Sequence, residues 1–235
     1  IPDSEYYIPG CEIVVRYEPA LKEAEVGGDF YDIFALDEDK IGIVIGDVAG
    51  KGLIAAIRVA EARHVIRCYA YIDPRPSRVL TLANDTLCKN QTQGTSMLTA
   101  FFAILDTKHG EIIYANGGHE SPVIARADGM TEDIEIQGRA LGVIEGYEYL
   151  EECRKLNPGD KIIMVTDGIS EARPGGQDFF GPEGIRNYVS SNCDSEICMI
   201  ADGLLEAAKK HAGGPLRDDA AIVAFTLTGD RLKCE

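Results

Sequence analysis

The sequence predicts an α+β fold in which two antiparallel sheets are flanked by helices. Strand candidates follow one another as hairpins along most of the chain, which does not suit an alternating parallel βαβ fold. The helical segments come in two pairs, near residues 53–89 and 183–210, with a group of strands between them. No repeat, low-complexity run or linker divides the 235 residues, so we expect a single domain over residues 1–235 with its core at about 12–228.

Composition narrows the functions that the chain can have. With 23 Lys and Arg against 39 Asp and Glu, the net charge is −16, which disfavours nonspecific nucleic-acid binding and attraction to an anionic membrane. The hydrophobic fraction of 45% is that of a packed globular protein. No apolar run approaches the roughly 20 residues of a transmembrane helix, and the start of the sequence lacks the features of a secretory signal.

The seven cysteines are widely spaced, and no two of them form a CxxC pair. This pattern disfavours both a disulfide framework and a zinc ribbon. We expect free, mostly buried thiols in a protein of the reducing cytoplasm. The cysteines are Cys11, Cys68, Cys88, Cys153, Cys193, Cys198 and Cys234.

A predicted hairpin near the start of the chain brings two aspartates together. After a strand at residues 12–17, the polar–apolar alternation of residues 29–34 and the apolar run at 41–45 predict two strands joined by a turn. Asp29 enters the first of these strands and Asp47 follows the second. Because those two ends of an antiparallel hairpin lie at the same edge, we expect Asp29 and Asp47 to be neighbours.

The other elements are predicted from periodicity and from turn residues. Helices are expected at residues 53–69 and 78–89, where apolar side chains recur at near-helical spacing on either side of a break that contains two prolines. Apolar runs between turn residues predict the remaining strands and helices. These strands are residues 97–105, 111–115, 122–125, 148–156, 162–165 and 221–227, and these helices are residues 183–190 and 196–210.

Four aspartates share one local setting, the end of an apolar strand beside a glycine or a second aspartate. They are Asp29, Asp47, Asp167 and Asp218. A single aspartate of this kind is ordinary turn chemistry. Four convergent carboxylates would repel one another, and hard divalent cations such as Mg²⁺ and Mn²⁺, which prefer carboxylate oxygen and water, would relieve that repulsion. No His and Cys cluster competes with them, so zinc is not expected.

Two motifs around these aspartates resemble a known family. Residues 26–32 (Val-Gly-Gly-Asp-Phe-Tyr-Asp) and 45–52 (Ile-Gly-Asp-Val-Ala-Gly-Lys-Gly) resemble the opening motifs of the bacterial SpoIIE/RsbU-type serine phosphatases, which are metal-dependent PPM (PP2C-like) enzymes. The resemblance runs from about Tyr17 to Leu227 and implies one phosphatase domain, a four-layer α/β/β/α sandwich with two central antiparallel sheets flanked by helices. Further motifs agree in order, at residues 99–105, 114–119, 141–143, 158–160, 166–172, 180–181 and 218–219.

The resemblance also implies a set of metal ligands. Asp47 would bridge two divalent cations, Mn²⁺ or Mg²⁺, and Asp29 would join it on one of them together with the backbone carbonyl of Val48. Asp167 and Asp218 would complete the other. Asp47 and Asp29 are thereby the candidate catalytic carboxylates.

Several other residues are secondary candidates. Asp219 and Asp32 are adjacent alternates for the metal site. His119 would donate a proton to the leaving group, although a structural role in packing a loop is the commoner one for such a histidine. No arginine is obviously placed to bind the phosphate, and Lys51 and Arg16 are the stand-ins for that contact.

The implied activity is hydrolysis of a phosphoserine or phosphothreonine on a signalling protein by direct attack of a metal-bridging water, without a phosphoenzyme. By analogy alone, the substrate would be a STAS-domain, anti-anti-sigma-type regulator in a stress or sigma-factor pathway. Because the sequence begins at Ile1, we expect that it was cut from a longer regulatory protein, with an N-terminal sensor or receiver domain.

The main alternative is a catalytically weak PPM-like module that binds or signals. It predicts losses among the metal aspartates, and all four are present. A GTPase is disfavoured because no GxxxxGK[ST] phosphate loop occurs, since residues 46–51 are one residue too short and Gly52 follows. A diguanylate cyclase is disfavoured because only 26 residues precede Gly27-Gly28-Asp29 and no Glu-Phe follows.

Overall fold

The structure is a computed structural model that describes residues 4–20, 27–90, 97–175 and 178–230. The chain forms two compact units, each assembled from separate segments. We call residues 23–119 and 136–155 the central unit, and residues 1–22, 120–135 and 156–235, which include both termini, the terminal unit.

The central unit contains a five-stranded antiparallel sheet in the order β3-β4-β5-β6-β9. The predicted hairpin forms its first two strands, with Phe30 paired to Gly46 and Ala35 to Ile41. The strands are β3 (Phe30–Ala35), β4 (Lys40–Val48), β5 (Leu98–Asp106), β6 (Glu111–Gly117) and β9 (Glu152–Lys155).

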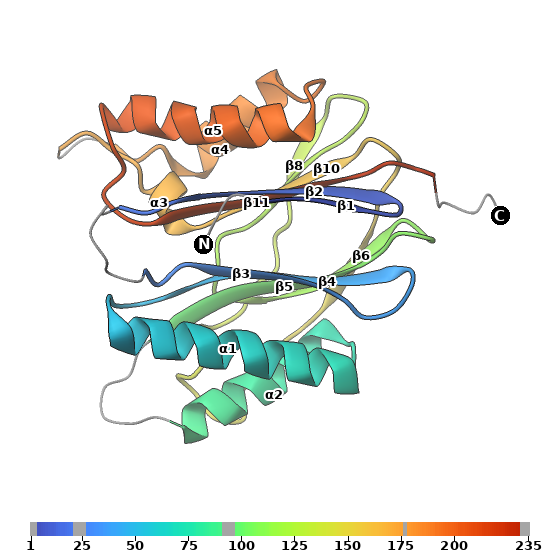
Figure 1. Cartoon of the computed structure of the whole chain (residues 1–235), viewed down its shortest axis with the longest axis vertical. Coiled ribbons are helices and arrows are strands. Elements are labelled where there is room, and N and C mark those ends of the chain that lie inside the picture. The colour runs from blue at the N-terminus through green and yellow to red at the C-terminus, as the bar shows by residue number, and fades with distance from the viewer. Residues whose placement is uncertain (1–3, 21–26, 91–96, 176–177, 231–235) are drawn as a thin grey trace. The chain divides into compact units, whose positions relative to one another are not determined.

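Two helices, α1 (Leu53–Ile72) and α2 (Pro76–Lys89), cover one face of this sheet (Figure 1). Pro76 begins α2 at a position where the missing N–H costs nothing. The helices bury their small and aliphatic side chains against alternate residues of the strands, because a strand turns every second side chain to the same face. The strand residues of this core include Phe30, Phe34, Val44, Val48, Ala100, Phe102 and Ile104.

The terminal unit contains a six-stranded antiparallel sheet in the order β1-β2-β11-β10-β7-β8. The last strand of the chain, β11, therefore lies between the second strand and β10. The strands are β1 (Ser4–Ile8), β2 (Cys11–Glu18), β7 (Val123–Ala125), β8 (Thr131–Asp133), β10 (Lys161–Val165) and β11 (Ala220–Leu227).

Three helices belong to the terminal unit: α3 (Asp167–Ser170), α4 (Gly181–Ser191) and α5 (Ile197–Ala212). The α4 and α5 helices cover one face of its sheet (Figure 1). Gly213 ends α5 in the left-handed conformation (φ 72°), which glycine adopts without a steric penalty, and Lys209, Lys210 and His211 complement the helix dipole there.

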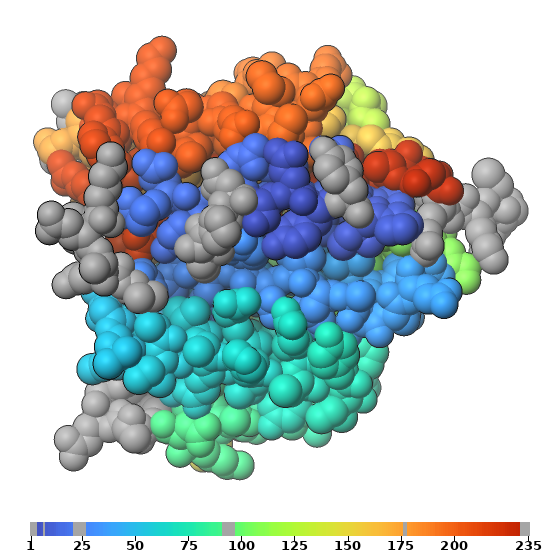
Figure 2. Space-filling model, in the orientation of Figure 1, coloured from blue at the N-terminus to red at the C-terminus, as the bar shows by residue number. Residues whose placement is uncertain are grey.

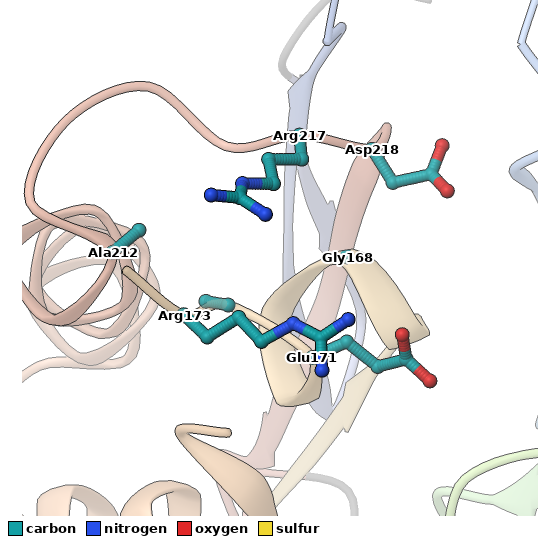
Figure 3. A pocket seen from close by; sticks show the side chains of 7 residues that line it. Gly168, Glu171, Arg173, Ala212, Arg217 and Asp218 are labelled. Atoms are coloured by element: carbon teal, nitrogen blue, oxygen red, sulfur yellow. The ribbon is translucent and has the colours of Figure 1, made fainter. Parts of the chain in front are cut away.

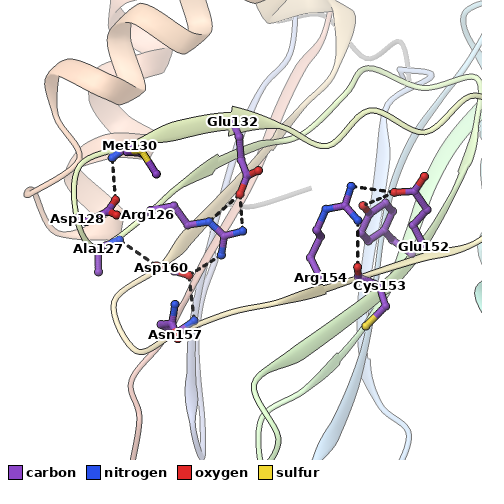
Figure 4. A network of polar contacts seen from close by, with 11 residues as sticks. Arg126, Ala127, Asp128, Met130, Glu132, Glu152, Cys153, Arg154, Asn157 and Asp160 are labelled. Atoms are coloured by element: carbon purple, nitrogen blue, oxygen red, sulfur yellow. Dashed lines mark hydrogen bonds and ion pairs between the residues drawn. The ribbon is translucent and has the colours of Figure 1, made fainter.

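A buried ion pair holds the turn before β10 (Figure 4). Asp160 is 2% exposed. Its carboxylate accepts a hydrogen bond from Nη1 of Arg126 at 2.8 Å. It also accepts hydrogen bonds from the backbone N–H groups of Ala127 and Asn157, at 2.9 Å each. Arg126 also pairs with Glu132. The Pro-Gly-Asp turn is therefore fixed by its aspartate to the β7–β8 hairpin.

The predicted fold class is confirmed: the structure contains two antiparallel sheets with flanking helices. The strand expected at residues 148–156 is wrong in extent, since only Glu152–Lys155 pairs with β6. The preceding Tyr149 packs instead in the core beneath the helices (5% exposed). The strands β1 and β8 and the four-residue α3 were not predicted. The prediction of one domain over the whole chain stays a prediction.

The six described cysteines are free, as predicted, but the expectation that they are mostly buried is wrong. Cys11 alone among these six is buried, while Cys68 and Cys153 are exposed because they lie on the solvent side of a helix and an edge strand. Cys234 and Val26 lie outside the described residues. In the described parts of the chain, no helix combines the length and hydropathy of a membrane span.

Candidate metal centre

Asp29 and Asp47 lie side by side at one end of the central sheet. Because Phe30 pairs with Gly46, the antiparallel register brings Asp29 opposite Asp47. Phe30 and Val48 pack against the helices, so alternation along the strands turns both carboxylates to the face away from α1 and α2. Asp29 is 4% exposed and Asp47 is half-buried. The two aspartates that were predicted to be neighbours are neighbours in the fold.

Gly28 packs closely against the end of β4 beside these carboxylates. A Cβ at residue 28 would lie 2.2 Å from the carbonyl oxygen of Val48 and 2.6 Å from Oδ1 of Asp47. The N–H of Val48 donates to the carbonyl of Gly28 at 3.1 Å, which fixes the two segments against each other. Only glycine fits this position, because the carbonyl oxygen of Val48 and the carboxylate of Asp47 come so close to its Cα.

A buried histidine, His119, contacts the strand next to the one that carries Asp47. Asp47 pairs with Thr99 in the β4–β5 ladder, and Oγ1 of Thr99 lies 2.9 Å from Nδ1 of His119. Asn116 brackets the histidine: its Oδ1 accepts the N–H of His119 at 2.7 Å, and its Nδ2 donates to the His119 carbonyl at 3.0 Å. The ring of His119, 9% exposed, is therefore held in place within the central unit.

In the terminal unit, the strand ends that carry Asp167 and Asp218 are joined by hydrogen bonds. Asp167 follows β10, and Asp218 precedes its partner strand β11. The N–H of Thr166 donates to the carbonyl of Ala221 at 3.0 Å, and Oγ1 of Thr166 accepts the N–H of Ala221 at 2.8 Å. Thr166 is completely buried, so this double contact fixes the two segments to each other.

The two adjacent aspartates before β11 have different environments. Oδ1 of Asp219 accepts the N–H of Ala20 at 2.9 Å. A Cβ at residue 168 would lie 1.9 Å from the carbonyl oxygen of Asp219, so Gly168 is required where α3 meets this segment. Asp218 is exposed, and its Oδ1 accepts the N–H of Asp219 at 3.0 Å. Asp219 thus has a structural hydrogen bond, and we retain Asp218 as the candidate ligand.

The structure removes Asp32 from the candidate ligands. It lies on the helix-facing side of β3, opposite to the side that carries Asp29, because Asp32 is an odd number of residues away. Its carboxylate accepts a hydrogen bond from Nε of Arg67 at 2.8 Å and forms an ion pair with Nη2 of Arg63 at 3.4 Å. This pair raises the pKa of Arg67, chiefly through the hydrogen bond to Asp32. The carboxylate therefore fastens α1 to the sheet.

The two basic side chains proposed as phosphate contacts differ. Arg16 is 9% exposed and is bound by Asp202 of α5 and by Glu5 at 3.2 Å, so it joins β2 to its neighbours and is not available to a phosphate. Lys51 is exposed in the loop after β4, between Gly50 and Gly52, both of which have positive φ. Because Lys51 is exposed close to the end of the strand that carries Asp47, it stays a candidate for the phosphate contact.

Two arginines beside Asp218 were missed at the sequence level. Arg173 and Arg217 line a pocket with Gly168 and Asp218, and Figure 3 shows their guanidinium groups turned into it. Their positions in the sequence could have indicated them, because Arg217 directly precedes Asp218 and Arg173 directly follows the motif that contains Asp167.

The donor atoms of both aspartate pairs suit a hard divalent cation. Carboxylate and carbonyl oxygens are the protein ligands that Mg²⁺ and Mn²⁺ prefer. Each pair is anchored on rigid strand ends by a close glycine contact, at Gly28 and at Gly168. One carboxylate oxygen of Asp29 and one of Asp47 lie within 4.8 Å of each other, so a cation bound between them would offset their mutual repulsion.

Two antiparallel sheets with flanking helices and acidic strand ends define the PP2C class of fold, and solved structures agree. The chain resembles the RsbU and RsbW domains of Rv1364c from Mycobacterium tuberculosis, with a TM-score of 0.83, 28% identity and coverage of 94% of this chain and 61% of that one. It resembles the SiaA-PP2C domain of Pseudomonas aeruginosa at a TM-score of 0.80, 21% identity and coverage of 92% and 85%. A more distant match in fold is the catalytic domain of the serine/threonine phosphatase PstP in complex with two manganese ions, with a TM-score of 0.63, 15% identity and coverage of 92% and 98%.

Residues 37–228 match the family described as stage II sporulation protein E (SpoIIE), and the chain belongs to this family. Among curated relatives, it is 27% identical to protein IcfG of Synechocystis over 95% of this chain, and 28% identical to the phosphoserine phosphatase RsbU of Bacillus subtilis over 86%. The chain spans 38% of the length of IcfG and 59% of the length of RsbU.

Proposed function

We propose that the chain is a metal-dependent protein phosphatase that hydrolyses phosphoserine or phosphothreonine on a signalling protein. The observation that carries the proposal is the Asp29–Asp47 pair, which the strand register places side by side with carboxylate oxygens within 4.8 Å of each other. Membership of the SpoIIE family and similarity to the phosphoserine phosphatase RsbU support the same activity.

The proposed centre holds two divalent cations, Mn²⁺ or Mg²⁺. Asp29, Asp47 and the carbonyl of Val48 would hold them together with Asp167 and Asp218, and Asp47 would be the ligand shared by both ions. The two manganese ions of the PstP structure, which has the same fold, support the choice of metal and the number of ions.

When bound, two such cations supply a water of lowered pKa and neutralise charge on the phosphoryl oxygens. The aspartates supply only ligand atoms, so no protein nucleophile is needed. The water oxygen forms a bond to phosphorus, the bond from phosphorus to the seryl oxygen breaks, and the departing oxygen takes a proton, giving a free hydroxyl and inorganic phosphate. His119, held by Thr99 and Asn116, is the candidate proton donor.

Exposed apolar side chains at the start of α1, the helix that follows β4 along the chain, support a protein substrate. Leu53, Ile54 and Ile57, at the start of α1, are 76%, 72% and 57% exposed. Apolar side chains grouped at a surface are typical of protein-binding sites. The α1 helix lies at the surface in Figure 2, where its atoms are cyan. We infer a phosphorylated regulatory protein as the substrate, of the STAS type by analogy with the relatives, acting in the cytoplasm.

The proposal is tested with para-nitrophenyl phosphate and a phosphoserine peptide in the presence of Mn²⁺. We expect hydrolysis that EDTA abolishes, and a loss of at least about a hundredfold, roughly 3 kcal/mol of barrier, in Asp47→Asn and in Asp167→Asn. Asp194→Asn is the matched control, because Asp194 is an exposed aspartate between α4 and α5. Activity that survives chelation would refute the two-metal mechanism.

The second candidate, a binding module without turnover, is favoured by a different result. It predicts Mn²⁺ binding, measured by calorimetry, without hydrolysis of either substrate.

A further inference from the structure

A small pocket in the terminal unit lies directly beside Asp218 (Figure 3). Its volume is about 110 Å³, more than three times the roughly 30 Å³ that a water molecule occupies in the liquid. The wall comprises the end of α5 at Ala212, the segment that leads into β11, and the residues that follow Asp167. The pocket therefore has room for a group of the size of a carboxylate or a phosphoryl group.

Two arginines supply hydrogen-bond donors to this pocket. The guanidinium carbon of Arg173 lies 4.2 Å from the centre of the Phe179 ring, which orients the side chain by a cation–π contact. Nη2 of Arg217 lies 3.4 Å from where a Cβ of Gly175 would be, so its guanidinium lies beside the segment that follows Arg173. Over the described ranges, neither guanidinium makes a hydrogen bond or an ion pair, in contrast to Arg16, Arg67 and Arg126.

The acidic residues of the pocket do not neutralise these arginines by contact. In Figure 3 the guanidinium of Arg217 points away from the carboxylates of Glu171 and Asp218, whereas that of Arg173 extends beside the Glu171 side chain without an ion pair to it. Asp218 is also a proposed metal ligand, so a cation would take up its charge. The pocket then has two unpaired guanidinium groups against one exposed carboxylate, that of Glu171.

We propose that Arg173 and Arg217 bind an oxyanion of the phosphoprotein substrate. The inference rests on the proposed function and assigns it a substrate-recognition site. A guanidinium presents a planar fork of donors that matches carboxylate and phosphoryl oxygens. The oxyanion is either the phosphoryl group that is hydrolysed or an acidic side chain next to the phosphoserine. These two sources share one chemistry, and kinetics separates them.

The kinetic experiment compares Arg173→Gln, Arg217→Gln and the double variant with the wild type in Mn²⁺. Arg75→Gln is the matched control, since Arg75 belongs to the central unit and pairs with Asp73 at the surface. We expect a rise in KM of at least about tenfold in the double variant and a smaller rise in Arg217→Lys, which keeps the charge but loses the fork. Unchanged KM values for all substrates would overturn the proposal.

The choice of substrate identifies the source of the oxyanion. If KM rises for para-nitrophenyl phosphate as well as for peptides, the arginines hold the reacting phosphoryl group. If KM rises only for phosphoserine peptides with flanking Asp or Glu, and not for peptides with flanking Ala, the arginines hold the flanking side chain. Either result supports the oxyanion pocket.

A binding measurement separates failure of this inference from failure of the proposed function. Inorganic phosphate is titrated in Mg²⁺ and followed by ³¹P NMR, which requires no turnover. We expect the double variant to bind phosphate at least about tenfold more weakly than the wild type. If the wild type is inactive but shows this dependence, the proposed activity fails and the pocket stands. If the wild type is active and the double variant has both wild-type phosphate affinity and unchanged KM values for all substrates, the pocket fails alone.

Discussion

Gly28→Ala tests whether Asp47 and the carbonyl of Val48 hold a metal ion. The added Cβ would lie 2.2 Å from the carbonyl oxygen of Val48 and 2.6 Å from Oδ1 of Asp47, both closer than atoms in contact can be. Relief of such an overlap costs about 1–3 kcal/mol and moves the neighbouring groups. The groups that must move are two of the proposed ligands. A loss of about 10- to 100-fold in Mn²⁺ affinity would correspond to about 1.4–2.8 kcal/mol of binding free energy.

Calorimetric titration with Mn²⁺ measures the affinity, and thermal unfolding in EDTA measures the stability without metal. We expect Gly28→Ala to bind Mn²⁺ about 10- to 100-fold more weakly. Gly214→Ala is the control, because a Cβ there meets no atom within 4 Å. Gly28→Ala with wild-type Mn²⁺ affinity and wild-type activity would show that neither group is a metal ligand, and the reasoning would be wrong.

Three further predictions concern stability. Asp160→Asn breaks the buried pair with Arg126 and should lower the free energy of unfolding by about 3 kcal/mol, seen as a drop in Tm of roughly 6–12 °C; an unchanged Tm would contradict this. Asp32→Asn should cost about 2 kcal/mol by urea unfolding while Mn²⁺-dependent activity is kept, because Asp32 bonds Arg67 and not a metal. Burial raises the pKa of Tyr114 to about 12 from the ordinary value of 10.0. The unfolded chain then loses this proton first, so stability should fall as pH rises from 10 to 12. Tyr114→Phe should flatten that slope, and an equal slope in both proteins would argue against it.

The strand-end aspartates were accessible to sequence reasoning because hairpin geometry is local. An apolar run, a turn and a second run determine which ends meet, and this placed Asp29 beside Asp47 without knowledge of the fold. The two helix pairs, near residues 53–89 and 183–210, were also predicted correctly, because apolar side chains recur there at helical spacing. Short elements such as β8 and α3 carry three or four residues, too few for a periodic signal.

Residues with long-range partners could not be assigned from the sequence. Asp32 lies three residues from Asp29 and resembles it chemically, but its role depends on Arg67, 35 residues away. Asp219 differs from Asp218 only through its hydrogen bond to Ala20, 199 residues earlier in the chain. The exposure of Cys68 likewise depends on which face of α1 meets the sheet.

The central claim is the proposal that Asp47 and Asp167 are ligands of one catalytic metal centre. A double-mutant cycle of Asp47→Asn and Asp167→Asn, with kcat/KM measured at saturating Mn²⁺, tests it directly. Residues that act as one unit give non-additive losses, so the double variant should be about as slow as the slower single variant. Losses that multiply, from about a hundredfold each to about ten-thousandfold together, would show that the two aspartates act independently and would contradict the account.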